Sequence, residues 1–186
     1  MADGAFELIQ TPRLLLRRPT PDDADAIFTR YTSDPEVTRY VGWPRHATVD
    51  DTRAFLSISD SLWERWPAGP YVILNRDDRS MLGSTGLIFE APSSAATGYV
   101  LAQDAWGRRF ATEALGAMVD LALKTGVLRL YALCHHAHRA SARVLEKEGL
   151  RTLLFENSRM RLYVPAMFGI YFPQRAPALG SVLQRR

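Results

Sequence analysis

The spacing of apolar residues changes along the chain, and the change predicts which segments form helices and which form strands. In the early part of the chain, apolar side chains recur every three or four residues, as on one face of a helix. Two such series occur, formed by Ala24, Ile27, Phe28 and Tyr31 and then by Phe55, Ile58 and Leu62. They predict two early helices, with a loop over 40–44 between them.

Both early helices are preceded by residues that can cap a helix. Thr20 stands before a proline and two aspartates, and Thr48 stands three residues before Asp51. A threonine side chain there can accept a hydrogen bond from a backbone N–H of the first turn, and the acidic residues favour the positive end of the helix. Ahead of the first helix, a short apolar run between two prolines predicts a first strand over 13–17.

From Pro70 onward the pattern changes to short apolar runs separated by turn residues. Three runs predict an antiparallel meander with turns at 75–78 and 92–94, and its strands are 71–74, 81–89 and 98–101. Helical and strand patterns then alternate, with helices over 111–124 and 141–148 and a strand over 128–134. Two further strands are predicted over 153–155 and 160–164. This order predicts a mixed α/β (α+β) sheet with at least one parallel pair.

Composition and charge limit the classes of function. The chain has 186 residues, 47% of them apolar and 23% charged, which is typical of one globular domain. A net charge of +3 from scattered Lys and Arg does not indicate a nucleic-acid partner. Cys134 is the only cysteine, which excludes an internal disulfide and a cysteine-rich zinc site. With neither a secretory signal nor a membrane span apparent, we expect a soluble cytoplasmic protein without a metal.

The stretch over 98–114 carries the clearest candidate chemistry. It joins a strand to a helix through a loop that contains Gly107, and Arg108 and Arg109 follow directly. The first turn of a helix presents unpaired backbone N–H groups and a partial positive charge, which together suit a pyrophosphate. A glycine lets the backbone approach the phosphates closely. The alternative is an ordinary strand-to-helix turn, which the spacing alone does not exclude.

Several short motifs follow one another along the chain in an order that resembles the GNAT acyltransferase superfamily, and in particular its RimJ/RimL-like branch. Gly-Tyr at 98–99, Trp-Gly at 106–107 and Ala-Thr-Glu-Ala at 111–114 resemble the acetyl-CoA loop of these enzymes. The segment 138–149, with Ser141 and then Val-Leu-Glu-Lys and a glycine, resembles the next motif. The segments 11–17 and 33–38 resemble the opening strand and first loop. The resemblance covers about residues 8–150.

The resemblance implies a mostly antiparallel, twisted sheet with a splayed parallel strand pair, flanked by helices. Acetyl-CoA, as co-substrate, would place its pantetheine arm in the gap, and a primary amine would enter from the side of the two early helices. The amine would attack the thioester directly, without an acyl-enzyme. The residues implied in cofactor binding are Tyr99, Val100, Leu101, Trp106, Gly107, Arg108, Arg109, Phe110, Ala111, Thr112, His138 and Ser141.

Three positions depart from the family pattern. Arg109 stands where a small residue is usual, and we expect it to adopt helical backbone angles. His138 stands at the usual asparagine, and it is either a cofactor contact or a solvated loop residue. Leu145 stands where many members carry a tyrosine that reprotonates the sulfur. Members without that tyrosine are proposed to use the motif serine, which is Ser141 here; that residue could also cap its helix.

The general base is not evident from the sequence. Some relatives carry a glutamate at the position of Thr97. Glu90 and His135 are the remaining candidates, and a relay through water would need neither. Ser141 and Glu90 are therefore the candidate catalytic residues.

The segment 165–186 does not follow the family pattern. We expect a single domain over 1–172, a loose tail over 173–186, and a monomer or homodimer. The predicted activity is acetyl transfer from acetyl-CoA to a protein amino terminus or a small amine. The alternative is a non-catalytic acyl-CoA-binding domain. A nucleotide-binding protein is disfavoured because no phosphate-loop or dinucleotide motif follows a strand.

Overall fold

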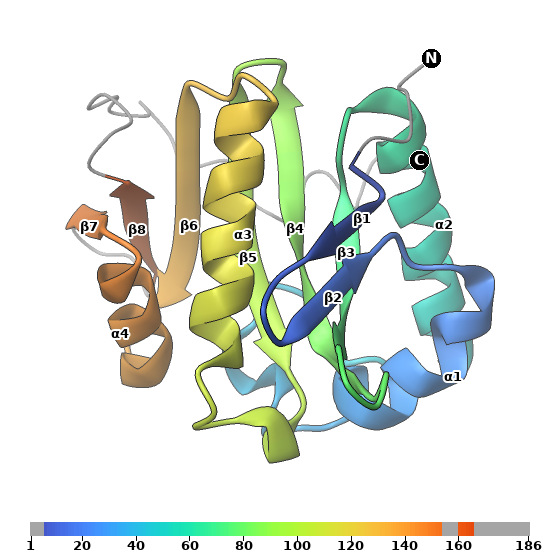
Figure 1. Cartoon of the computed structure of the whole chain (residues 1–186). Coiled ribbons are helices and arrows are strands. Elements are labelled where there is room, and N and C mark those ends of the chain that lie inside the picture. The colour runs from blue at the N-terminus through green and yellow to red at the C-terminus, as the bar shows by residue number, and fades with distance from the viewer. Residues whose placement is uncertain (1–5, 154–159, 166–186) are drawn as a thin grey trace.

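A computed structural model of the chain describes residues 6–153 and 160–165. Within these residues eight strands form one sheet in the order β1-β2-β3-β4-β5-β6-β8-β7 (Figure 1). The strands are β1 (Leu8–Gln10), β2 (Leu14–Arg17), β3 (Pro70–Asn75), β4 (Met81–Ala91), β5 (Ser94–Leu101), β6 (Arg129–His135), β7 (Leu150–Leu153) and β8 (Met160–Pro165). The β5–β6 pair is parallel and the other pairs are antiparallel, which confirms the predicted mixed sheet.

Four α-helices accompany the described sheet: α1 (Ala24–Ile27), α2 (Val49–Arg65), α3 (Phe110–Lys124) and α4 (Arg139–Lys147). At the start of α2, Asp51 N–H donates to Thr48 Oγ1 over 3.4 Å and Thr48 N–H donates to Asp51 Oδ2 over 2.9 Å, so the predicted cap is confirmed. The first predicted helix is instead a succession of a 3₁₀ turn, the short α1 and a π-helical turn over Phe28–Thr32. The strand β1 was not predicted from the sequence.

The core consists of two clusters of buried side chains, one on each face of the sheet. Alternate residues of a strand point to opposite faces, so Tyr71 and Ile73 of β3 contact one cluster and Val72 and Leu74 the other. The first cluster packs beneath α3 and α4, and the second packs beneath α1 and the middle of α2. The apolar stripe predicted for α3 is buried, which fixes this helix across β4 and β5 (Figure 1).

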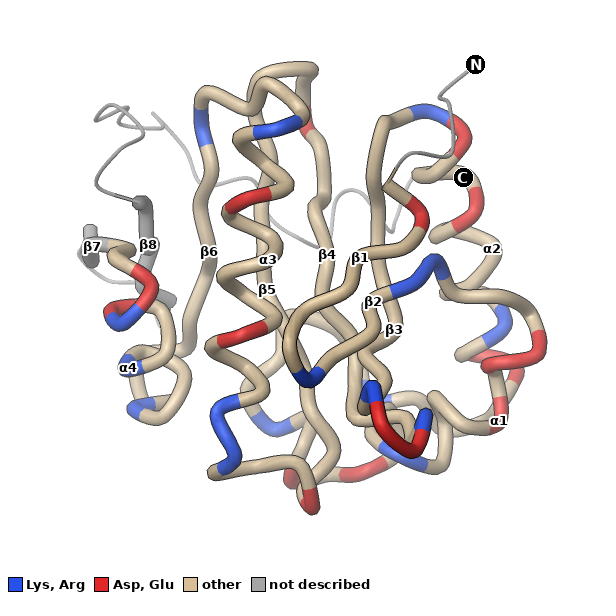
Figure 2. The backbone as a smooth tube through the Cα atoms, in the orientation of Figure 1, with Lys and Arg blue, Asp and Glu red and all other residues tan. Residues whose placement is uncertain are grey.

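No helix among the described residues is long and apolar enough to cross a membrane. Charged residues are spread over the elements, and basic residues occupy the segment through which the chain enters α3 (Figure 2). The predicted tail over 173–186 and most of the segment 165–186 lie outside the described residues.

Candidate active site

The parallel strands β5 and β6 pair over only part of their length. Their register runs from Ser94 opposite Arg129 to Thr97 opposite Ala132. Beyond that point β5 continues to Leu101, still paired with β4, while β6 pairs with β8 on its other side. The two strands therefore part after Thr97 and leave a gap between their carboxy-terminal ends, here called the splay.

The edge of β5 that faces the splay offers backbone hydrogen-bonding groups. Ala102 N–H donates to Leu82 O over 2.8 Å, and the alternation of an antiparallel ladder then turns the backbone groups of Val100 toward β4 and those of Tyr99 and Leu101 toward the splay. The indole N–H of Trp106 donates to Leu101 O over 2.8 Å. A ligand in the splay would therefore meet the N–H and C=O of Tyr99 and the N–H of Leu101.

The loop that leads from β5 into α3 is curved by two residues with left-handed backbone angles. Gly107 has a φ of +73°, and a Cβ built on it would meet no atom within 4 Å. Arg109 has φ 63° and ψ 14°, so the expectation that it adopts right-handed helical angles was wrong. It is the residue before the helix, which begins at Phe110. Left-handed residues separated by Arg108 turn successive N–H groups toward one side, which is an anion-binding arrangement.

The first turn of α3 adds further donors to this concave loop. The first hydrogen bond within the helix runs from Glu113 N–H to Arg109 O over 3.2 Å. The backbone N–H groups of Phe110, Ala111 and Thr112 therefore have no acceptor within the helix. No side chain caps this helix end. The positive end of the helix and its open amides thus face the same space as the loop.

A hairpin from the start of the chain holds this loop in place. Glu113 Oε1 accepts hydrogen bonds from Thr11 Oγ1 over 2.5 Å and from Arg13 N–H over 2.9 Å. The guanidinium of Arg13 donates to Glu113 Oε2 over 2.7 Å and to Arg108 O over 3.0 Å. Burial alone would raise the pKa of Glu113, but these hydrogen bonds outweigh it and keep that pKa below its ordinary value.

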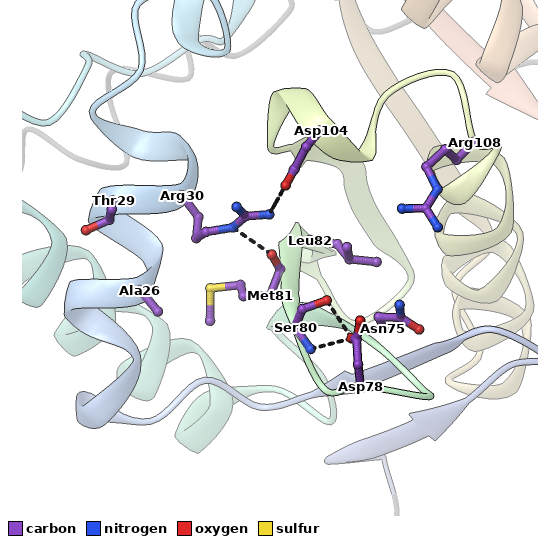
Figure 3. Close-up of a pocket in the computed structure, with 10 residues that line it drawn as sticks. All are labelled: Ala26, Thr29, Arg30, Asn75, Asp78, Ser80, Met81, Leu82, Asp104 and Arg108. Atoms are coloured by element: carbon purple, nitrogen blue, oxygen red, sulfur yellow. Dashed lines mark hydrogen bonds and ion pairs between the residues drawn. The ribbon is translucent and has the colours of Figure 1, made fainter.

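The side chains of the loop separate into buried and exposed sets. Phe110 is buried, and the guanidinium groups of Arg13 and Arg108 each lie 4.8 Å from its ring centre. Arg108 also lines a pocket of about 570 Å³ between the first helical segment, the β3–β4 turn and this loop. Figure 3 shows Arg108 and Arg30 reaching into the pocket from opposite sides, with Arg30 paired to Asp104 over 2.8 Å.

The strained backbone at Arg109 leads to a prediction about stability. Arg109→Gly should stabilise the fold by roughly 0.5 to 1 kcal/mol, because left-handed angles cost a non-glycine residue about 1 to 2 kcal/mol and glycine loses part of the gain through unfolded-state flexibility. Thermal unfolding should therefore shift upward by roughly 1 to 4 °C. Arg109→Ala, which keeps the strain, is the matched control. An equal gain in both variants would show that the arginine side chain, not its backbone, carries the cost.

Ser141 lies beside the splay on the face that α3 and α4 cover. The helix α4 begins at Arg139 with His138 before it, so Ser141 is the third helical residue and the expectation that it caps the helix was wrong. Its Oγ instead accepts a hydrogen bond from the hydroxyl of Tyr99 over 3.1 Å. Both side chains are half-buried. The bond joins β5 to the helix that follows β6, and so it spans the splay.

Comparison with known proteins identifies the family of this chain. A family model described as an acetyltransferase (GNAT) domain matches residues 13–151, which include β5, the loop, α3 and α4. The chain belongs to the GNAT acetyltransferase family. It is therefore an acyltransferase that depends on acetyl-CoA.

The relatives of this GNAT domain agree with the resemblance seen in its sequence. The chain is 29% identical to an uncharacterized N-acetyltransferase, YoaA, of Bacillus subtilis over 82% of this chain and 90% of that one. Among solved structures, RimL, a ribosomal L7/L12 α-N-protein acetyltransferase in complex with coenzyme A, has a TM-score of 0.74 at 20% identity, covering 87% of this chain and 99% of that one. A GNAT-family acetyltransferase from Bacillus anthracis has a TM-score of 0.72 at 23% identity, covering 84% and 95%.

In this GNAT domain, His135 at the end of β6 and His138 just after it contact a tyrosine from the loop between α1 and α2. The ring of Tyr40 lies 4.8 Å from His138, stacked, and 5.1 Å from His135. Burial lowers the pKa of His138, and the neighbouring His135 lowers it further, so His138 is neutral near pH 7. Tyr40 thus brings the loop between α1 and α2 against the carboxy-terminal end of β6.

Glu90 is not brought together with Ser141. It lies where β4 turns into β5, beside the first pair of the parallel strands, and Tyr131 OH donates a hydrogen bond to its Oε1. Arg129 lies 3.8 Å from its Oε2 and Ser94 Oγ lies 3.3 Å from the same atom. At about 3.3 Å per residue, Glu90 is about 10 Å along the sheet from the point where the strands part.

Two site residues were missed or given too small a role by the sequence. Tyr99 was assigned only to cofactor binding, while its hydroxyl is the partner of Ser141. Tyr40 was placed in a loop without a role. The periodicity of a sequence does not show whether a tyrosine serves for the packing of its ring or for the function of its hydroxyl. A contact between residues 42 positions apart cannot be derived from a local pattern.

Proposed function

We propose that this protein transfers the acetyl group of acetyl-CoA to the primary amine of a protein amino terminus or of a small molecule. The observation that carries the proposal is the continuity of three features: the splay, the loop with alternating backbone angles and the open amide end of α3. Together they offer an unpaired strand edge and a set of open backbone amides that suit a long thiol cofactor with a pyrophosphate at one end.

In this proposal, the amides from Gly107 to Thr112 bind the pyrophosphate, and Arg108 and Arg109 add positive charge at its entrance. The pantetheine arm lies in the splay and bonds the backbone of Tyr99 and Leu101. A backbone N–H of β5 then polarises the thioester carbonyl. The chain supplies position and electrostatic stabilisation, and the acetyl group passes directly to the amine in the ternary complex.

The amine enters from the face of α1, α2 and the loop that carries Tyr40. This face is separated from Ser141 by the sheet, so the amine and the proton donor to sulfur act from opposite sides of the thioester. Successive side chains of β6 point to opposite faces of the sheet, and this supports the placement. Cys134 packs in the buried cluster beneath α3 and α4, while His135, the next residue, contacts Tyr40.

Binding of the cofactor should stabilise the folded state. At a concentration about 100 times its Kd, acetyl-CoA adds about 2.7 kcal/mol by linkage. For a chain of this size the unfolding temperature should rise by about 5 to 10 °C. The measurement is thermal unfolding with acetyl-CoA, with free acetate as the control. No shift at millimolar acetyl-CoA would contradict the proposed site.

A further inference from the structure

The hydrogen bond between Tyr99 and Ser141 has a direction that matters for the departing thiol. The phenolic O–H of Tyr99 donates to Ser141 Oγ over 3.1 Å. A serine hydroxyl has one hydrogen and two acceptor lone pairs, so Ser141 remains able to donate its own hydrogen to a third atom. Because the bond spans the splay, an atom lying in the splay is the natural recipient.

A serine alone is a poor acid for this task. Its hydroxyl ionises far less readily than a phenol, whose ordinary pKa is about 10, so it gives up a proton much more readily when another group replaces that proton at the same time. We propose that Tyr99 supplies the proton that the coenzyme A thiolate gains and that Ser141 relays it. This inference rests on the proposed function and assigns Tyr99 a part in the same reaction.

The step balances in atoms and charge. The amine nitrogen forms a bond to the acetyl carbon, the carbon–sulfur bond breaks, and its electron pair stays on sulfur. Sulfur takes the hydrogen of Ser141, Ser141 takes the hydrogen of Tyr99, and the phenolate regains a proton from water. The amine nitrogen releases one proton to water, so the number of protons is unchanged.

The surroundings of Tyr99 keep its hydroxyl protonated between turnovers. Burial raises the pKa of Tyr99 to about 12, although the hydrogen bond to Ser141 acts in the other direction. The same loss of water raises the pKa of a thiol enclosed beside it, which brings donor and acceptor closer in acidity. Besides Ser141, the titratable group that acts on Tyr99 is Cys134 on β6, which also raises its pKa. The side chains that α3 contributes to the buried cluster beside Tyr99 are apolar.

Tyr99→Phe removes the hydroxyl and keeps the ring. We expect kcat to fall about tenfold, the effect of one hydrogen bond lost in the transition state, while KM for acetyl-CoA stays close to the wild-type value. The unfolding temperature should fall about as much as in Ser141→Ala, because both variants lose the same hydrogen bond. Ser141→Ala should lower kcat further, and the double variant should be no slower than Ser141→Ala alone. Tyr71→Phe is the matched control, because Tyr71 OH donates to Phe6 O in another part of the core.

A second variant separates proton supply from packing. Incorporation of 3,5-difluorotyrosine at position 99 keeps the ring and the hydroxyl but makes the phenol more acidic. The kcat of this variant should fall with rising pH over a range in which the wild-type kcat stays constant. Adding Cys134→Ala should leave the pH of that fall unchanged. A wild-type kcat in Tyr99→Phe, or a pH profile that fluorination leaves in place, would overturn the relay. A wild-type protein that neither binds acetyl-CoA nor turns it over would instead refute the proposed function.

Discussion

Ser141→Ala should lower kcat about 100-fold and change the affinity for acetyl-CoA by less than about threefold. A positioned general acid contributes about 10²- to 10⁴-fold, and the low end applies because a thiolate whose free pKa is about 8.5 leaves without much help. The effect belongs to kcat because the hydroxyl is needed when charge develops on sulfur, not when the cofactor binds. The measurements are steady-state kinetics and acetyl-CoA binding on the same preparation.

The stability of the Ser141→Ala variant provides the internal check. Ser141 does not cap α4, and alanine is a good helix former, so the loss should be limited to one hydrogen bond, about 1 kcal/mol. Ser61→Ala on α2, where the exposed Ser61 Oγ donates to Ser57 O, is a control for the loss of a helical serine hydroxyl away from the site. If kcat is retained in Ser141→Ala, water reprotonates the sulfur and Ser141 serves only as the partner of Tyr99.

Gly107→Val should weaken acetyl-CoA binding by about 10- to 100-fold while the fold remains intact. The side chain would extend into the space where, in the proposed site, the loop amides would face the pyrophosphate. Hydrogen bonds to charged groups contribute about 1.5 to 3 kcal/mol each. Isothermal titration with acetyl-CoA measures the loss directly.

A second glycine of the chain provides a control for the backbone strain that this substitution introduces. Gly126, after the end of α3, has a φ of +76° against +73° at Gly107, and neither position has an atom within 4 Å of a Cβ built there. Gly126→Val should therefore lose about as much stability as Gly107→Val, roughly 1 to 2 kcal/mol, but keep its affinity for acetyl-CoA. Equal affinities in the two variants would mean that the pyrophosphate binds elsewhere.

The sequence predicted the fold wherever local chemistry determines the structure. The capping threonine and aspartate of α2, the apolar stripe of α3 and the turns of the meander each depend on residues close together in the chain, and the structure confirms them. The strand β1 was missed because it has three residues, too few for a periodic signal.

The details of the site depend on tertiary packing and were less accessible. Arg109 has left-handed angles that no local signal favours for an arginine, and the hairpin contacts of Arg13 with Glu113 and with Arg108 O accompany them. The point at which β5 and β6 part cannot be read from the apolar pattern, which continues through both strands. The position of Glu90 beside Arg129 and Tyr131 follows from strand register, which sequence alone does not give.

The most direct test of acetyl transfer is a single reaction of the purified protein with acetyl-CoA and a panel of amines that includes peptide amino termini and polyamines. Mass spectrometry of the amines and quantification of free thiol should show acetylated product and coenzyme A forming in equal amounts for at least one amine. At an acetyl-CoA concentration near the wild-type KM, Gly107→Val should form both more slowly. If acetyl-CoA stabilises the protein while no amine is acetylated, the chain is an acyl-CoA-binding domain without turnover, and the proposed function is wrong.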